Sequence, residues 1–144
     1  MAERYRHTQI GYVIICALFT SIVLIAYLMS LYRFNFIPFI VMIILAVCLL
    51  LFATLTVTIQ AEVLEIRFGP GIIRKQFLLR DIASCRIVRN PLYYGWGIHL
   101  TPHGWLYNVS GSNAVEIRMK TGKKYRIGTD VPEELERAIS RSIQ

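Results

Sequence analysis

The chain opens with two long apolar segments separated by a short polar turn. No Asp, Glu, Lys or Arg occurs between Arg6 and Arg33, or between Arg33 and Glu62. The apolar parts of these gaps run over 9–31 and 36–57. As α-helices, which rise 1.5 Å per residue, both would be about 33 Å long, enough to cross a hydrocarbon core about 30 Å thick. The pattern predicts two transmembrane helices that form an antiparallel hairpin.

The distribution of basic residues predicts the orientation of this hairpin. Arg4 and Arg6 precede the first segment, Arg33 lies at the turn, and all other Lys and Arg residues follow Glu62. The positive-inside rule then places both termini in the cytoplasm. Rings suited to the opposite interface gather near the turn: Tyr27, Tyr32, Phe34, Phe36 and Phe39. A cleaved signal peptide is the alternative for the first segment, but its apolar stretch is too long and no small-x-small cleavage site follows.

From position 55 onward the pattern changes to the alternation that is typical of half-buried strands. Seven antiparallel strands are expected, over 55–60, 63–69, 72–78, 84–89, 105–110, 114–120 and 123–129. A C-terminal amphipathic helix should follow, with Asp130 as its cap and Pro132 in its first turn. We therefore expect a tail and hairpin over 1–58 and a cytoplasmic β-barrel or sandwich over 59–144, closed by the helix.

This order of elements resembles a known family. The runs LLRDIASCRIV, YYGWGIHLTPHGWLYNVSG and TGKKYRIGTDVPEELERAI are similar to those of bacterial pleckstrin-homology-like (PH-like) domains, which often follow one or two transmembrane helices. The resemblance covers about the last 85 residues and implies one sheet folded over at right angles, with the helix plugging one open end. It also implies a bacterial inner-membrane protein that acts in binding or assembly.

Composition narrows the possible functions. Hydrophobic residues make up 55% of the chain and charged residues 17%, which excludes a disordered chain, and three cysteines do not make a disulfide scaffold. No nucleophile elbow, phosphate loop or carboxylate pair is present, so we expect no enzyme, no catalytic residue and no cofactor. His99 and His103 flank Pro102 without a further ligand, which argues against a metal site. The spans carry no charged residue deep inside, which argues against transport.

An aromatic, glycine-rich loop is the most distinctive local feature. Tyr93, Tyr94, Trp96 and Trp105 lie close to several glycines, and such rings can build a core, a partner-binding patch or a stacking platform for nucleic acid. A membrane tether makes nucleic acid the weakest of these explanations. We predict that these four residues contact a protein partner. Ala17 and Ser21 form a small-xxx-small pair on which a partner helix could dock.

Two groups of basic residues suggest contact with lipid, in keeping with a net charge of +7. Arg67, Arg74 and Lys75 surround a Phe-Gly-Pro-Gly turn. The second group lies on the last predicted hairpin and comprises Lys120, Lys123, Lys124 and Arg126. Each basic residue near an anionic surface contributes about 1 kcal/mol of attraction, although both groups could also be solvated strand faces.

The leading hypothesis is therefore a non-enzymatic integral membrane protein that acts as an accessory or assembly subunit of a larger membrane complex. Its cytoplasmic domain would contact a membrane-protein partner. The alternative is a module that binds anionic lipid at the membrane surface. The two hypotheses differ in which residues carry the function, since the first uses the aromatic loop and the second the basic strands.

Overall fold

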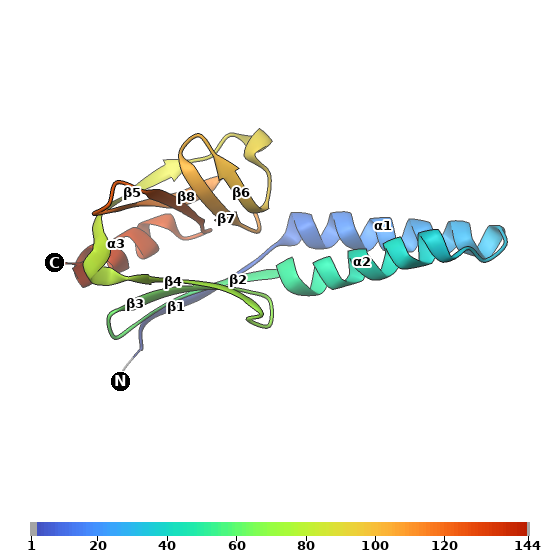
Figure 1. Cartoon of the computed structure of the whole chain (residues 1–144), viewed down its shortest axis with the longest axis horizontal. Helices are drawn as coiled ribbons and strands as arrows, with labels where there is room; N and C mark the ends of the chain where they lie inside the picture. Colours follow the sequence, from blue (N-terminus) through green and yellow to red (C-terminus); the bar gives the residue numbers. More distant parts are fainter. Residues whose placement is uncertain (1–2, 144) are drawn as a thin grey trace.

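The structure is a computed structural model that describes residues 3–143, with side chains from Tyr5 onward. The Arg4 side chain, which contributes to the predicted charge pattern, lies outside this description. Figure 1 shows a β domain with two facing sheets and, projecting from one end of it, a long pair of helices. The two parts follow from the change of hydrophobic period along the chain.

The hairpin consists of α1 (Tyr12–Leu31) and α2 (Phe36–Phe52), and neither helix has a buried residue. Asn35 starts α2, because its side-chain oxygen accepts a hydrogen bond of 2.9 Å from the Ile37 N–H. In the described part of the chain, α1 is the one helix that is long and apolar enough to cross a membrane, since α2 has only 17 residues.

The second apolar segment was predicted to stay helical as far as 57, and this is wrong. Helix α2 ends at Phe52, and β2 (Thr54–Gln60) begins two residues later. The reason is the sequence TLTVTI, in which β-branched residues alternate with apolar ones and favour an extended backbone. As a strand, β2 is also hydrogen-bonded to β1 on one side and β3 on the other, and a helix would lose these bonds.

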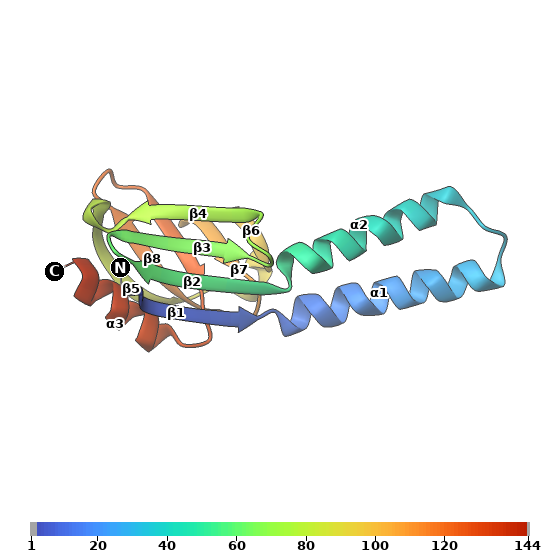
Figure 2. The ribbon, with the colours of Figure 1, turned by 90° about the horizontal axis from the view of Figure 1, so that it is seen from below.

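The first sheet joins residues from both sides of the hairpin. Its order is β1-β2-β3-β4, all antiparallel, with β1 at Glu3–Ile10, β3 at Val63–Phe68 and β4 at Ile73–Leu78. We did not predict β1, and the segment 84–89, which is the fourth strand expected from the sequence, belongs to the other sheet. The hairpin is thus an insertion between two adjacent strands (Figure 2), and the expected boundary after position 58 falls inside β2.

The second sheet has five strands in the order β5-β8-β9-β7-β6. They are β5 (Ile82–Arg89), β6 (Gly97–Thr101), β7 (Gly104–Asn108), β8 (Asn113–Met119) and β9 (Lys124–Gly128). β7 and β9 are parallel, which corrects the expectation of an entirely antiparallel domain. Two short 3-10 helices, η1 (Leu79–Asp81) and η2 (Leu92–Tyr94), flank β5. With β1 and β6 added, residues 3–143 contain nine strands rather than seven.

The core lies between the two sheets and is closed on one side by α3 (Pro132–Ile143). This helix packs on β5 and β8, and its fully buried Leu135 and Ile139 lie on the stripe predicted from the sequence. The acidic Glu133 and Glu134 occupy the first turn, where they complement the helix dipole. The predicted amphipathic C-terminal helix is therefore confirmed.

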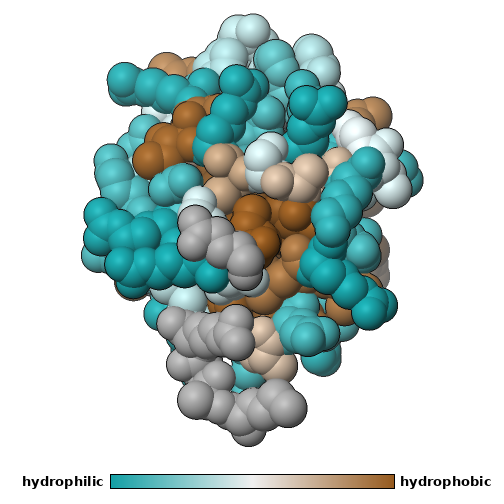
Figure 3. Space-filling view, turned by 90° about the vertical axis from the view of Figure 1, so that its left-hand side faces the viewer, coloured by the Kyte–Doolittle hydropathy of each residue, from teal (hydrophilic) through white to brown (hydrophobic). Residues whose placement is uncertain are grey.

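The β domain has two distinct ends. At the hairpin end, where β1 and β2 join the helices, the Gly69 N–H donates to the Thr54 carbonyl at 2.9 Å. At the far end, the Leu79 N–H donates to the Glu62 carbonyl at 2.9 Å, and the Lys120 N–H donates to the Asp81 carbonyl at 2.8 Å. The far end shows mainly hydrophilic side chains around a small apolar hollow (Figure 3).

Candidate functional site

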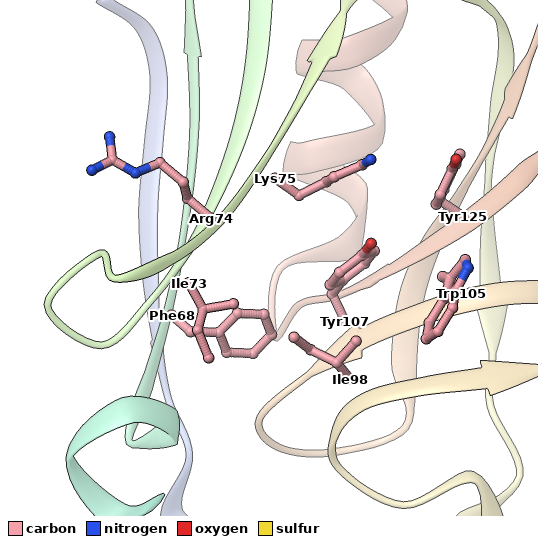
Figure 4. Close-up of a pocket in the computed structure, with 8 residues that line it drawn as sticks. All are labelled: Phe68, Ile73, Arg74, Lys75, Ile98, Trp105, Tyr107 and Tyr125. Carbon is pink, nitrogen blue, oxygen red and sulfur yellow. The ribbon is translucent and has the colours of Figure 1, made fainter. Parts of the chain in front are cut away.

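A groove opens between the two sheets on the side that α3 leaves uncovered. It has a volume of about 350 Å³ and lies between the edge strand β4 and the strands β6, β7 and β9. Figure 4 shows the side chains that line it, which are Phe68, Ile73, Arg74, Lys75, Ile98, Trp105, Tyr107 and Tyr125. Ligand pockets usually combine such apolar and aromatic walls with a few polar groups, and this groove is at the small end of their size range.

One end of the groove is apolar and lies against the base of the hairpin. Phe68 and Ile73 are register partners at the hairpin end of β3 and β4, and Ile98 lies near them (Figure 4). The Phe68 ring contacts Phe52, the last residue of α2, with their centroids 5.4 Å apart. It also approaches Tyr107, at 6.3 Å. A chain of aromatic rings therefore runs from the helices into the groove.

Lys75 supplies positive charge to the groove. It is opposite Ile66, whose side chain is in the core, so strand alternation turns Lys75 toward the space between the sheets. Its ammonium lies 5.7 Å from the centroid of the Phe77 ring and 5.8 Å from that of Tyr125. Among the side chains described, no carboxylate forms an ion pair with Lys75. An inward-pointing Lys on an edge strand also discourages pairing with other strands.

The two other basic residues of the first predicted group lie at the hairpin end, Arg67 outside the groove and Arg74 at its rim. Arg67 is on the outer face of the first sheet, where its Nε donates to the Glu65 carboxylate. A side-chain hydrogen bond from Gln76, together with Arg67, lowers the pKa of Glu65 against the opposing effect of burial. Arg74 donates from Nε to the Gly71 carbonyl at 3.2 Å, and its guanidinium points away from the other lining side chains (Figure 4).

The structure divides the second predicted basic group. Lys120, Lys123 and Lys124 are exposed around the β8–β9 turn, at the far end of the domain. Arg126 is only 5% exposed, so its assignment as a lipid-binding residue is wrong. Its Nε donates to Glu116 Oε2 at 2.9 Å and its Nη1 donates to Asn90 Oδ1 at 2.9 Å. Sequence alternation put Arg126 on the outer face, but Glu116 and the neighbouring loop cover that position.

Glu116 also accepts a hydrogen bond from Arg86, on the other side of β8. Burial alone would raise the pKa of Glu116, but the hydrogen bonds and charges of Arg126 and Arg86 outweigh it and the pKa is lowered. The glutamate is therefore ionised at neutral pH and holds three strands of the second sheet together. The pair formed by Glu116 and Arg126 is structural, because these two opposite charges neutralise each other beneath the surface.

The four predicted aromatic contact residues are also separated. Trp105 lines the groove and remains 43% exposed. Tyr93 is 84% exposed on η2, where its ring meets Tyr94 edge-on at 5.1 Å. Trp96 is half-buried in the loop before β6, and its carbonyl accepts a hydrogen bond from His99 Nε2. Of the four, only Trp105 lines the groove together with Lys75. Tyr93, Tyr94 and Trp96 lie on a second, separate surface before β6.

Several groove residues were missed by sequence reasoning. Ile98 lies on β6, whose short alternation GIHLT was hidden inside the aromatic loop. Phe68, Ile73 and Tyr125 fall in predicted strands but carry no chemical signature of a site. The one signal in the sequence was Lys75 at an inward position of β4, which alternation alone identifies. To place the four missed residues at the groove, one must know how the two sheets approach each other.

The groove can bind a molecule that has both an apolar part and a negative charge, because it offers rings, aliphatic walls and one unpaired cation. Within residues 3–143, no three His, Cys, Asp or Glu side chains come together in a way that could hold a metal ion. No protein-family model, curated protein or solved structure matches the chain. The resemblance to PH-like domains therefore stays a prediction from the sequence.

Proposed function

We propose that the chain is a non-enzymatic integral membrane protein of the bacterial inner membrane. The hairpin would span the bilayer twice, and the β domain would lie in the cytoplasm as an accessory or assembly subunit that contacts another membrane protein. The observation that carries the proposal is the surface of the hairpin. Apolar side chains are exposed all along it, including Phe19, Leu24, Ile44 and Leu50 at 54% or more, and water is a poor solvent for such a surface.

The dimensions of the helices are compatible with two spans. α1 has 20 residues and is about 30 Å long, which matches the hydrocarbon core. α2 has 17 residues and is about 26 Å long, at the lower limit for a spanning helix. A short helix is accommodated by local thinning of the bilayer, at a cost of a fraction of a kcal/mol per Å. The tip residue Arg33 and its neighbouring rings then reach the opposite interface.

The way the hairpin is connected supports a structural role for the domain. Because β1 and β2 pair directly, with Gln9 opposite Leu55, the domain is attached to both helices through one continuous sheet. This double attachment holds the domain at a fixed height above the membrane. A partner bound to the surface of the domain would therefore be held in a defined position, as an assembly subunit requires.

Two surfaces are available to a protein partner. In the membrane, Ala17 is exposed on α1, and the Ser21 hydroxyl is satisfied by the Ala17 carbonyl at 2.8 Å, so this small-residue face is open to another helix. In the cytoplasm, Trp105 and Tyr93 are large aromatic residues with substantial exposure, of the kind that dominates binding energy at interfaces.

The alternative, an anionic-lipid surface module, is favoured by one observation. Arg67 and Arg74 lie at the hairpin end, where lipid headgroups would surround the domain. The exposed Lys120, Lys123 and Lys124 lie at the far end, away from the leaflet that would hold the hairpin, so they do not contribute. The lipid hypothesis thus rests on fewer charges than the sequence suggested.

The test is extraction of the tagged full chain from native membranes in mild detergent, followed by sizing and mass spectrometry. We expect a stoichiometric membrane-protein companion, and we expect Trp105→Ala to weaken the association while Lys123→Gln, at the far end, leaves it unchanged. A lone chain or a homo-oligomer would contradict the assembly role. Release of the chain by alkaline carbonate, which strips peripheral proteins, would contradict the membrane hairpin itself.

A further inference from the structure

The groove changes from apolar to positively charged along its strands, in the direction away from the hairpin. Ile73 is the cross-strand partner of Phe68, which in turn is the partner of Leu55. Leu55 lies two residues after Ala53, the C-cap of α2. At 3.3 Å per strand residue, this apolar end lies about 7 Å from the helix. Lys75 is the cross-strand partner of Ile66, which is the partner of Val57, so Lys75 lies about 13 Å from the helix.

The leaflet of a bilayer has the same polarity in the same direction. Acyl chains lie at the depth of the helices, and the anionic headgroup layer extends roughly 5–8 Å beyond the hydrocarbon. The apolar end of the groove thus lies at headgroup depth, and Lys75 is attached just above it. The Lys75 ammonium lies near the rings of Phe77 and Tyr125, and Phe77 is two strand residues farther from the hairpin than Lys75. A phosphate bound to it lies beyond its normal depth, so the first part of an attached acyl chain rises out of the leaflet and lies against the apolar end of the groove, where it stays shielded from water.

We propose that this groove binds one anionic phospholipid of the surrounding leaflet. One acyl chain lies along Phe68, Ile73 and Ile98, and the phosphate pairs with Lys75 beside Tyr125. The proposal rests on the proposed function in one respect, namely that the hairpin is in the membrane. The occupant is a lipid because the groove is continuous with the base of the hairpin through the contact between Phe52 and Phe68.

Size and charge define the class of lipid. A volume of about 350 Å³ is small for a ligand site, so it takes a single chain and leaves the second in the bilayer. Lys75 is unpaired among the described side chains, and Arg74 lies at the rim, so a net negative headgroup gains more than a zwitterionic one. The exposed Trp105 pairs with Tyr125 at the polar end of the groove, close to the position of the phosphate.

Fluorescence quenching by brominated lipid tests the proposal on the full chain. Trp96→Phe leaves Trp105 as the only tryptophan, since the chain has two. This variant is reconstituted in nanodiscs that contain a small fraction of phosphatidylglycerol or of phosphatidylcholine with brominated acyl chains. We expect phosphatidylglycerol to quench Trp105 at least threefold more effectively. Lys75→Gln should remove this preference, Lys75→Arg should retain it, and Lys123→Gln should leave it unchanged.

Equal quenching by the two lipids would overturn the proposal, and so would a preference that survives Lys75→Gln. No quenching by either lipid would also overturn it, because a protein segment or water then fills the groove. Thermal unfolding of the Lys75→Gln variant, monitored by circular dichroism, shows whether it is folded, and Lys75→Met serves as a second neutral variant. A chain that carbonate releases from membranes contradicts the hairpin, whereas a chain that inserts without a lipid preference contradicts the groove proposal alone.

Discussion

Gly11 and Ala53 meet where the two helices leave the β domain. The Gly11 N–H donates to the Ala53 carbonyl at 2.7 Å, which continues the pairing of β1 and β2 by one step into the hairpin. Gly11 is buried, and the loop between β7 and β8 packs against it. Both sheets therefore converge on the base of the hairpin.

Replacement of Gly11 by Val should destabilise the protein, because a Cβ at this position would lie 2.8 Å from the Val109 carbonyl oxygen. The neighbour is backbone and cannot rotate away, so we expect a loss of about 1–3 kcal/mol of unfolding free energy. Urea unfolding of the full chain in mild detergent, followed by tryptophan fluorescence, measures it. Ala83→Val, at an exposed position of β5, is the matched control. Equal stability of the two variants would contradict close packing at the base.

Substitution of Glu116 by Gln should cost about 3 kcal/mol or more, because it leaves the buried Arg126 guanidinium without its carboxylate. Arg86→Gln removes the other partner of Glu116, but the Arg86 side chain is 66% exposed, so we expect less than about 1 kcal/mol. The urea midpoints of the two variants measure the difference between these two losses of unfolding free energy. A double variant, Glu116→Met with Arg126→Met, should recover much of the loss. If Arg86→Gln were the more harmful change, the buried pair would not be the important one.

Stability should fall as the solution becomes acidic. The pKa values of Glu65 and Glu116 are both lowered in the folded protein, so folding favours their ionised forms. The stabilisation is complete above the ordinary carboxyl pKa of 4.5 and is lost as the pH falls through the lower native values. Thermal midpoints recorded between pH 3 and 7 should therefore decline below about pH 4.5. The decline should be smaller in Glu116→Gln, and a midpoint that rises on acidification would refute the assignment.

Cysteine labelling tests the predicted topology. After Cys16, Cys48 and Cys85 are replaced by Ala, single cysteines are introduced as Tyr32→Cys at the hairpin tip and Thr121→Cys at the β8–β9 turn. In intact spheroplasts, a membrane-impermeant maleimide should label the tip and not the turn, because the basic residues favour a cytoplasmic domain. In inverted vesicles the pattern should reverse. Labelling of both positions in both preparations would mean that the hairpin does not cross the bilayer.

The sequence determined those elements whose pattern is local. The apolar stretches gave α1 and most of α2, and alternation located seven of the nine strands found in residues 3–143, including β8 with its inward-facing Val115 and Ile117. The spacing of apolar residues also gave α3 and the face that it buries. These predictions succeeded because 2.0- and 3.6-residue periods record which side of an element is shielded from water.

Only the tertiary structure decided which strands and side chains are neighbours in space. β1 becomes a strand because β2 offers it a partner across the inserted hairpin, although the intervening chain separates them by more than 40 positions. Arg126 reads as a surface cation from alternation, yet Glu116 on the next strand makes it a buried ion-pair partner. Lys75 and Trp105 meet at one groove because two sheets approach at an open edge. Long-range pairing of this kind depends on the registers of strands far apart in the chain, and a single sequence carries no local trace of them.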